Sequence, residues 1–195
     1  MNAAIPGFEE SAAREILFTF EDFERMDEAG VFGTPPARVE LLEGKFYRMS
    51  PASSGHGGST ADVIFALMSA LERAGESAFR VITHATVKIG EHNAPEPDVY
   101  VVTPTKAKYS TNADTVLVIE IAYSTRETDL NLKRRVYAKG GIPEYWVLEP
   151  ERNRLVVFRL PTPEGVYQTE FVLAREETVS PLFAPQIKIA LKDLL

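Results

Sequence analysis

Hydrophobic and polar residues along the chain follow helical spacing in three segments. Residues 19–30 open with Thr19 as N-cap, carry acids in the first turn and end at Gly30, which predicts a short helix. Residues 61–75 repeat apolar positions every three to four residues and also close on a glycine. A third helix is predicted over 126–140, before paired glycines.

Other segments alternate with the period of two that is typical of strands. Residues 38–49 alternate around Glu43-Gly44 and predict a β-hairpin, and the following segment 50–60, rich in Gly and Ser, reads as a loop. Further strands are predicted at 79–90, 95–102, 115–124, 144–150, 154–160 and 165–174, with a strand or short helix at 185–195. The segments 144–150 and 154–160 should form a second hairpin.

This order predicts an α/β fold, with a mixed β-sheet flanked by helices and preceded by an N-terminal helix and hairpin. We expect one domain over 1–195, with 1–17 as a loose arm. The helix over 126–140 joins two strands, so they should be parallel and linked by a right-handed crossover.

Composition narrows the function classes. The chain has 195 residues, no cysteine and a net charge of −7. Disulfides, thiolate catalysis and cysteine zinc sites are excluded, and tight non-specific binding to nucleic acid is disfavoured. The first residues lack the apolar core of a secretory signal, and no apolar run approaches the roughly 20 residues needed to span a membrane. We therefore expect a cytoplasmic protein without a membrane partner.

One acid stands in an otherwise apolar strand. Glu120 lies within TVLVIEIAYS and shares a strand face with Val118 and Ala122. Asp98 opens the strand after Pro97, so the two carboxylates could meet on neighbouring strands. Carboxylates that close repel each other unless a cation lies between them, and Mg²⁺ is commonly held by one or two carboxylates plus waters.

The predicted helix after this strand carries Asp129, Lys133 and Tyr137 at intervals of four, so they form one stripe. Lys133 could reach over the sheet and act on a water or on developing charge. The alternative is structural, with Glu120 and Lys133 as a buried ion pair and Asp129 and Lys133 as a surface pair.

Together these residues carry a family resemblance. The segments VELLEGKFYRMSP, PEPDVYVV and VLVIEIAYSTRETDLNLKRRVYAKGGIPEYWVLEP, with His56, resemble the Uma family of restriction endonucleases in the PD-(D/E)XK nuclease superfamily. The resemblance covers about 18–150. It rests on the joint order of Pro97-Asp98, Glu120, Ser124, Asp129, Lys133, Tyr137, Gly141 and the segment EYW.

The resemblance implies a restriction-endonuclease-like fold and a site for Mg²⁺ or Mn²⁺. Asp98 and Glu120 would be the metal-binding acids, and the carbonyl of Ile121 a further ligand. The superfamily lysine, two residues after the glutamate, is replaced here by Ala122. The family pattern has a lysine at Lys133, which we therefore expect to assist catalysis from the helix.

Two further residues match the family. Glu40, in the first hairpin, could complete the acidic pocket. His56, in the Gly-Ser segment, is a candidate on the substrate side, although a lone histidine there could equally be solvated or bond the start of a helix.

The implied function is a metal-dependent endonuclease with DNA as substrate, and a homodimer is expected by analogy. The alternatives are a non-catalytic binding or scaffold protein with the same fold, and a hydrolase of another phosphoester. A basic rim around the pocket would favour the nuclease; its candidate members are Arg126, Lys133, Arg134, Arg135 and Lys139.

Overall fold

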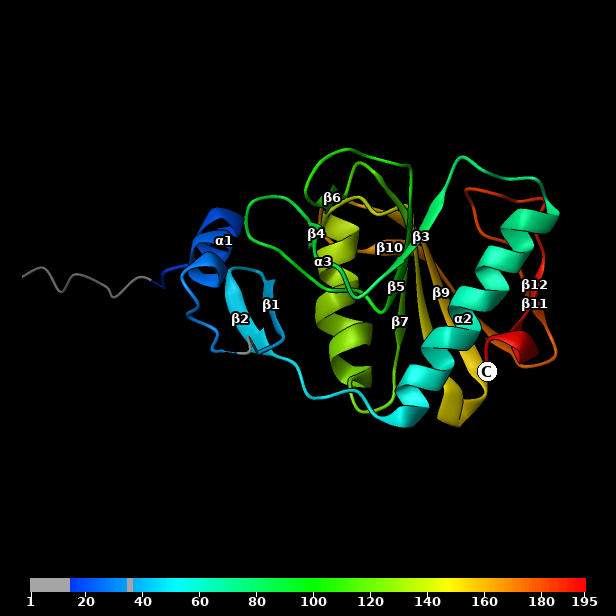
Figure 1. Cartoon of the computed structure of the whole chain (residues 1–195). Coiled ribbons are helices and arrows are strands. Elements are labelled where there is room, and N and C mark those ends of the chain that lie inside the picture. The colour runs from blue at the N-terminus through cyan, green and yellow to red at the C-terminus, as the bar shows by residue number, and fades with distance from the viewer. Residues whose placement is uncertain (1–14, 35–36) are drawn as a thin grey trace, which may run out of the picture.

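The computed structural model describes residues 15–34 and 37–195. Its centre is a six-stranded sheet in the order β10-β9-β8-β7-β5-β3 (Figure 1). Strands β7 and β8 are parallel, and the other neighbouring strands are antiparallel. The bounds are β3 (Arg80–Thr83), β5 (Val99–Val102), β7 (Thr115–Ile121), β8 (Glu144–Glu149), β9 (Arg154–Pro161) and β10 (Tyr167–Ala174). The mixed sheet and the parallel pair are as predicted.

Helices cover both faces of this sheet. The long helix α2 (Ser54–Arg73) packs on one face, where Leu67 meets Ile119 and its neighbours. The other face, with Val118 and Ala122, is covered by a π-helix η1 (Thr128–Lys133) that continues into α3 (Arg134–Lys139). In Figure 1 these two helical layers stand on opposite sides of the strands.

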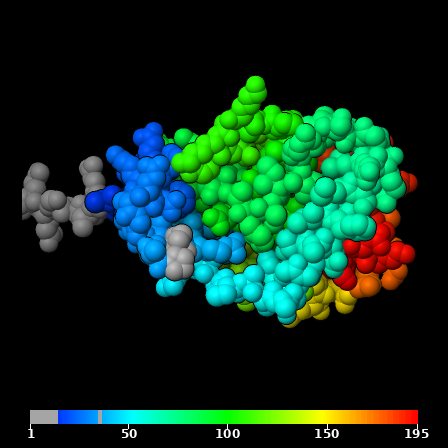
Figure 2. All heavy atoms as spheres, in the orientation of Figure 1, coloured from blue at the N-terminus to red at the C-terminus, as the bar shows by residue number. Residues whose placement is uncertain are grey.

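A smaller unit at the N-terminal end combines α1 (Phe20–Glu28) with the hairpin β1 (Val39–Leu42) and β2 (Lys45–Arg48). Thr19 and Asp22 form a capping box at the start of α1, which confirms the predicted N-cap. The unit has its own core, which includes Phe20 and Phe23, and it forms one end of the molecule (Figure 2).

Short elements complete the fold. β4 (Val87–Lys88) pairs with β6 (Ser110–Thr111), and β11 (Thr178–Val179) pairs with β12 (Ile189–Ala190). The 3₁₀ turns are η2 (Pro150–Arg152) and η3 (Leu191–Asp193). In the described part of the chain, no helix is both long enough and apolar enough to cross a membrane.

Three predicted elements differ from the structure. The segment 50–60 is not a loop throughout, because Ser53 caps α2 and the helix starts at Ser54. The strand predicted over 79–90 is broken after β3, where His84 has a φ of 49°. The third helix begins as a π-helix. The predicted arm 1–17 lies largely outside the described residues.

Candidate active site

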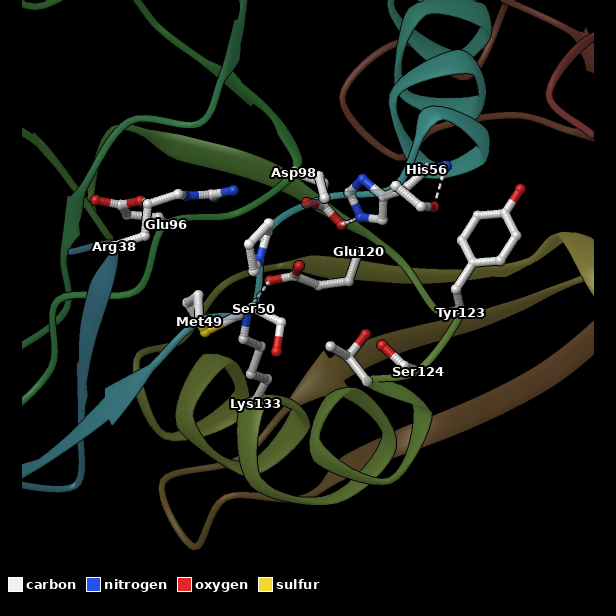
Figure 3. Close-up of a pocket in the computed structure, with 14 residues that line it drawn as sticks. Arg38, Met49, Ser50, His56, Glu96, Asp98, Glu120, Tyr123, Ser124 and Lys133 are labelled. Carbon is white, nitrogen blue, oxygen red and sulfur yellow. Dashed lines mark hydrogen bonds and ion pairs between the residues drawn. The ribbon is translucent and has the colours of Figure 1, made fainter.

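A cavity of about 110 Å³ lies where the N-terminal hairpin, the start of α2, the end of β7 and η1 meet (Figure 3). Asp98, Glu120, Lys133 and His56 all line it. Four residues predicted from different parts of the sequence are therefore brought together. Glu40 is connected to these four residues by its ion pair with Lys133.

Strand pairing explains how the two acids meet. Val99 of β5 lies opposite Ile119 of β7, so Asp98, one residue earlier, lies opposite Glu120. Both side chains face the same cavity in Figure 3, and both are buried. The two carboxylates lie on one face of the sheet, as the strand pattern predicted.

Asp98 is held by two donors on one oxygen. Its Oδ2 accepts a hydrogen bond of 2.8 Å from the backbone N–H of Ile121 and lies 3.1 Å from Nε2 of His56. Burial raises the pKa of Asp98, but the hydrogen bond and charge of His56 outweigh it, so the pKa lies below its usual value. The same hydrogen bond raises the pKa of His56. Asp98 therefore ionises more readily than an ordinary aspartate.

Glu120 also receives its donors on one oxygen. Lys133 Nζ lies 3.0 Å from Oε1, and the hydroxyl of Tyr137 donates to the same oxygen at 2.6 Å. Burial raises the pKa of Glu120 well above its usual value, and Lys133 opposes this while Asp98 adds to it. The two acids of the site therefore differ in how readily they ionise.

Lys133 bridges two carboxylates. Its Nζ lies 2.9 Å from Oε1 of Glu40 as well as 3.0 Å from Oε1 of Glu120, and the residue is only 2% exposed. Burial lowers the pKa of Lys133, but the carboxylates around it outweigh this and raise the pKa above its usual value. Lys133 therefore remains a buried ammonium ion.

Glu40 has one oxygen in use and one without a partner. Its Oε1 accepts from the backbone N–H of Glu96 at 2.8 Å in addition to its contact with Lys133. Its Oε2 is buried and has no hydrogen-bond partner among the described residues. A buried carboxylate oxygen without a partner costs free energy of folding, so Glu40 is a candidate for a role in the site.

The π-helix places Asp129 in the same charged cluster. Asp129 is 1% exposed, and the hydroxyl of Thr125 donates to its Oδ2 at 2.6 Å. Burial raises the pKa of Asp129 to about 6, and Lys133 opposes that rise. The idea of an ordinary surface pair between Asp129 and Lys133 is wrong, because both side chains are buried.

The sequence analysis did not identify three residues close to the site, which are His84, Arg38 and Glu96. His84 Nδ1 lies 4.0 Å from Oδ1 of Asp98 and 3.4 Å from Nη2 of Arg38. Arg38 also reaches Oε2 of Glu96 at 3.5 Å. His84 carried no signal, since it lies inside what reads as one continuous strand. The available signal for Arg38 was its place two residues before Glu40 in the predicted hairpin.

The basic residues of the third helix do not form one rim around the cavity. Arg135 and Lys139 pair with Glu43, and Arg134 pairs with Glu170. Arg126 pairs with Glu149, and Lys133 is buried. The basic rim that would have favoured the nuclease is therefore absent among these residues.

The donors present suit a hard cation. Within 15–34 and 37–195, no group of three or more His, Cys, Asp or Glu side chains is arranged to hold a metal ion. Mg²⁺, however, is commonly bound by only one or two carboxylates and completes its shell with water. Oδ1 of Asp98 and Oε2 of Glu120 accept no hydrogen bond from the described residues, so each acid keeps an oxygen for such an ion.

Comparisons with known proteins identify the family of the chain and a similar fold. A model of the Uma2 family, described as "Putative restriction endonuclease", matches residues 20–192. The fold is similar to the crystal structure of "a putative nuclease belonging to DUF820" from Anabaena variabilis ATCC 29413. That likeness has a TM-score of 0.66 and 19% identity, and covers 91% of this chain and 97% of the other. No curated protein sequence gives a significant match.

Proposed function

Because the chain belongs to the Uma2 family, described as "Putative restriction endonuclease", we propose that it hydrolyses phosphodiester bonds of DNA with the help of Mg²⁺ or Mn²⁺. One observation carries this proposal. Asp98 and Glu120 lie opposite each other on neighbouring strands and face one cavity, with a buried ammonium beside them. A non-catalytic scaffold does not require two carboxylates and a buried ammonium around one cavity.

Asp98, Glu120 and the carbonyl of Ile121 are the groups proposed to hold the ion. A bound ion of this kind supplies Lewis-acid polarisation of the phosphate and a lower pKa for a nearby water. The free oxygens of the two acids support this assignment. The backbone N–H of Ile121, by bonding Asp98 Oδ2, keeps that carboxylate at the end of β7.

Lys133 is proposed to stabilise the negative charge that develops on the phosphate. Its ammonium is held between Glu40 and Glu120 and excluded from water, where its charge acts more strongly than in bulk solvent. This role would replace the lysine that the superfamily carries at the position of Ala122. Glu40 is proposed to hold the ammonium in place.

His56 is proposed to act on the substrate side through Asp98. Its Nε2 faces Asp98, and its Nδ1 is buried without a hydrogen-bond partner among the described residues. It thereby orients Asp98 and lies in the wall of the cavity that a phosphate would enter.

The test is cleavage of plasmid and single-stranded DNA with Mg²⁺, Mn²⁺ or EDTA, with the wild type beside Glu120→Gln. The matched control is Glu144→Gln, which removes an equally buried strand carboxylate that pairs with Arg159 away from the cavity. We expect metal-dependent cleavage by the wild type and the control, and none by Glu120→Gln. Cleavage by Glu120→Gln at the wild-type rate would refute the proposal.

A second candidate is a non-catalytic binding protein that keeps the nuclease fold. The net charge of −7 and the pairing of helix cations with acids favour it. DNA binding without cleavage in any metal would support this candidate, and hydrolysis of small phosphodiesters alone would indicate a different phosphoester substrate. Assembly as a homodimer is also a proposal, to be tested by light scattering.

A further inference from the structure

The donors around Glu120 are arranged unevenly. Both hydrogen bonds that the carboxylate accepts from described residues end on Oε1, at 3.0 Å from Lys133 and 2.6 Å from Tyr137. Oε2 accepts none, although the residue is only 2% exposed. Unlike Oε2 of Glu40, this oxygen is not among the fully buried atoms without a partner, so it is open to the cavity that Glu120 lines.

We propose that Tyr137 is a positioning residue whose hydroxyl fixes the rotation of the Glu120 carboxylate, so that Oε2 is left for a divalent cation. The inference rests on the proposed function, because it assigns Tyr137 a part in the metal site suggested above. Tyr137 touches neither substrate nor ion and acts only through Glu120.

Tyr137 is better suited to this role than Lys133. The ammonium of Lys133 is shared with Glu40 and can donate three hydrogens, so it does not by itself select one oxygen of Glu120. The ring of Tyr137 is fully buried and its centroid lies 4.9 Å from that of Tyr145, so its hydroxyl oxygen is held in place and offers a single hydrogen to Glu120. A neutral donor also orients the acid without changing the charge of the site.

The competing interpretation is that the bond only satisfies a buried hydroxyl, and Tyr145 provides the control. Tyr145 is equally buried, lies next to Tyr137 and donates a 3.0 Å hydrogen bond to the backbone carbonyl of Asp129. Tyr137→Phe and Tyr145→Phe remove the same atom from the same core. Only the first change removes a contact with Glu120.

The experiment measures Mn²⁺ affinity by calorimetric titration of the full chain without nucleic acid, together with the melting temperature of each apo protein. Loss of a group that orients a metal ligand typically weakens metal affinity by about 10- to 100-fold. We expect Tyr137→Phe to weaken Mn²⁺ binding at least about tenfold. Tyr145→Phe should keep wild-type affinity, while both variants lose apo melting temperature to a similar degree.

Two results for the variants would overturn the inference: wild-type Mn²⁺ affinity in Tyr137→Phe, or an equal loss of affinity in both variants. If the wild type cleaves DNA and Tyr137→Phe binds Mn²⁺ normally, the inference fails while the proposed function stands. If the wild type binds Mn²⁺ but cleaves nothing, the function fails and the two variants still decide the role of Tyr137. A wild type that binds no Mn²⁺ overturns the inference as well.

Discussion

Replacing Lys133 by methionine tests the charge balance of the site directly. The ammonium is buried and lies 2.9 Å from Glu40 Oε1 and 3.0 Å from Glu120 Oε1. Methionine has an unbranched side chain that can fill much of the same space but carries no charge. The variant therefore leaves two buried carboxylates without their shared cation.

The expected loss of stability is large. Removing one partner of a buried ion pair typically costs about 3–5 kcal/mol, because the remaining charge is left uncompensated. For a chain of this size each kcal/mol corresponds to roughly 2–4 °C in melting temperature, so we expect a fall of roughly 6–20 °C near neutral pH. Protonation of a carboxyl limits the loss, which favours the lower part of this range.

The loss should depend on pH with a definite sign. Burial already raises the pKa of Glu120, and without Lys133 that pKa rises further. An acid whose folded-state pKa is raised contributes stability that is present below its unfolded pKa and lost as pH rises through the folded pKa. The difference between Lys133→Met and wild type should therefore shrink from about pH 8 to about pH 5.

The assay is thermal unfolding of wild type and Lys133→Met at both pH values, with Lys139→Met as matched control. Lys139 lies on the same helical segment, but it is about half exposed and pairs with Glu43 at the surface. DNA cleavage by Lys133→Met, where it stays folded, should fall by about 10²-fold or more. An unchanged melting temperature, or an equal loss at both pH values, would refute the argument from buried charge.

Two other predictions concern His56 and Glu43. The hydrogen bond to Asp98 raises the pKa of His56, so its stabilising contribution is present below the unfolded pKa of about 6.5 and lost as pH rises through the folded pKa. The wild type should lose more melting temperature over that rise than His56→Asn, whereas parallel curves would contradict this. Hydrogen bonds from Arg135, and to a lesser extent from Lys139, lower the pKa of Glu43 to about 2. Glu43→Gln should lower the free energy of unfolding by about 0.5–1 kcal/mol, a small loss because these ion pairs are half exposed. Urea unfolding should show that difference shrinking at about 1 M NaCl, and a salt-independent loss would point to packing instead.

The alternation of apolar and polar residues was sufficient to predict the sheet and to place Asp98 and Glu120 on its strands. The β-branched run around Glu120 and the Pro97-Asp98 strand start carry local signals, and a helix between two strands implies a parallel crossover. These features depend on short-range pattern, which is why the structure matches them. That Asp98 and Glu120 lie opposite each other is then a consequence of strand pairing.

Features that depend on tertiary contacts could not be predicted in this way. Gly57 and Gly58 disfavour a helix locally, yet α2 begins at Ser54, where the Ser53 cap and the burial of nearby residues offset that cost. His84 adopts a positive φ that no strand pattern predicts, so its approach to Asp98 was missed. Spacing left the role of Lys133 open between catalysis and a buried ion pair, and only the resemblance favoured catalysis.

The π-helix makes the site sensitive to the number of residues in the chain as well as to their identity. A π-helix bonds each residue to the fifth one along, whereas an α-helix bonds it to the fourth. Deleting the exposed residue Asn131 would allow 128–133 to rewind as an α-helix, whose residues are about 100° apart around the axis. The positions of Asp129 and Lys133 around the helix axis would then change relative to each other, although every charged residue would still be present. Related sequences that differ by one residue in this segment should therefore be aligned by their gaps before a lysine is assigned to the site.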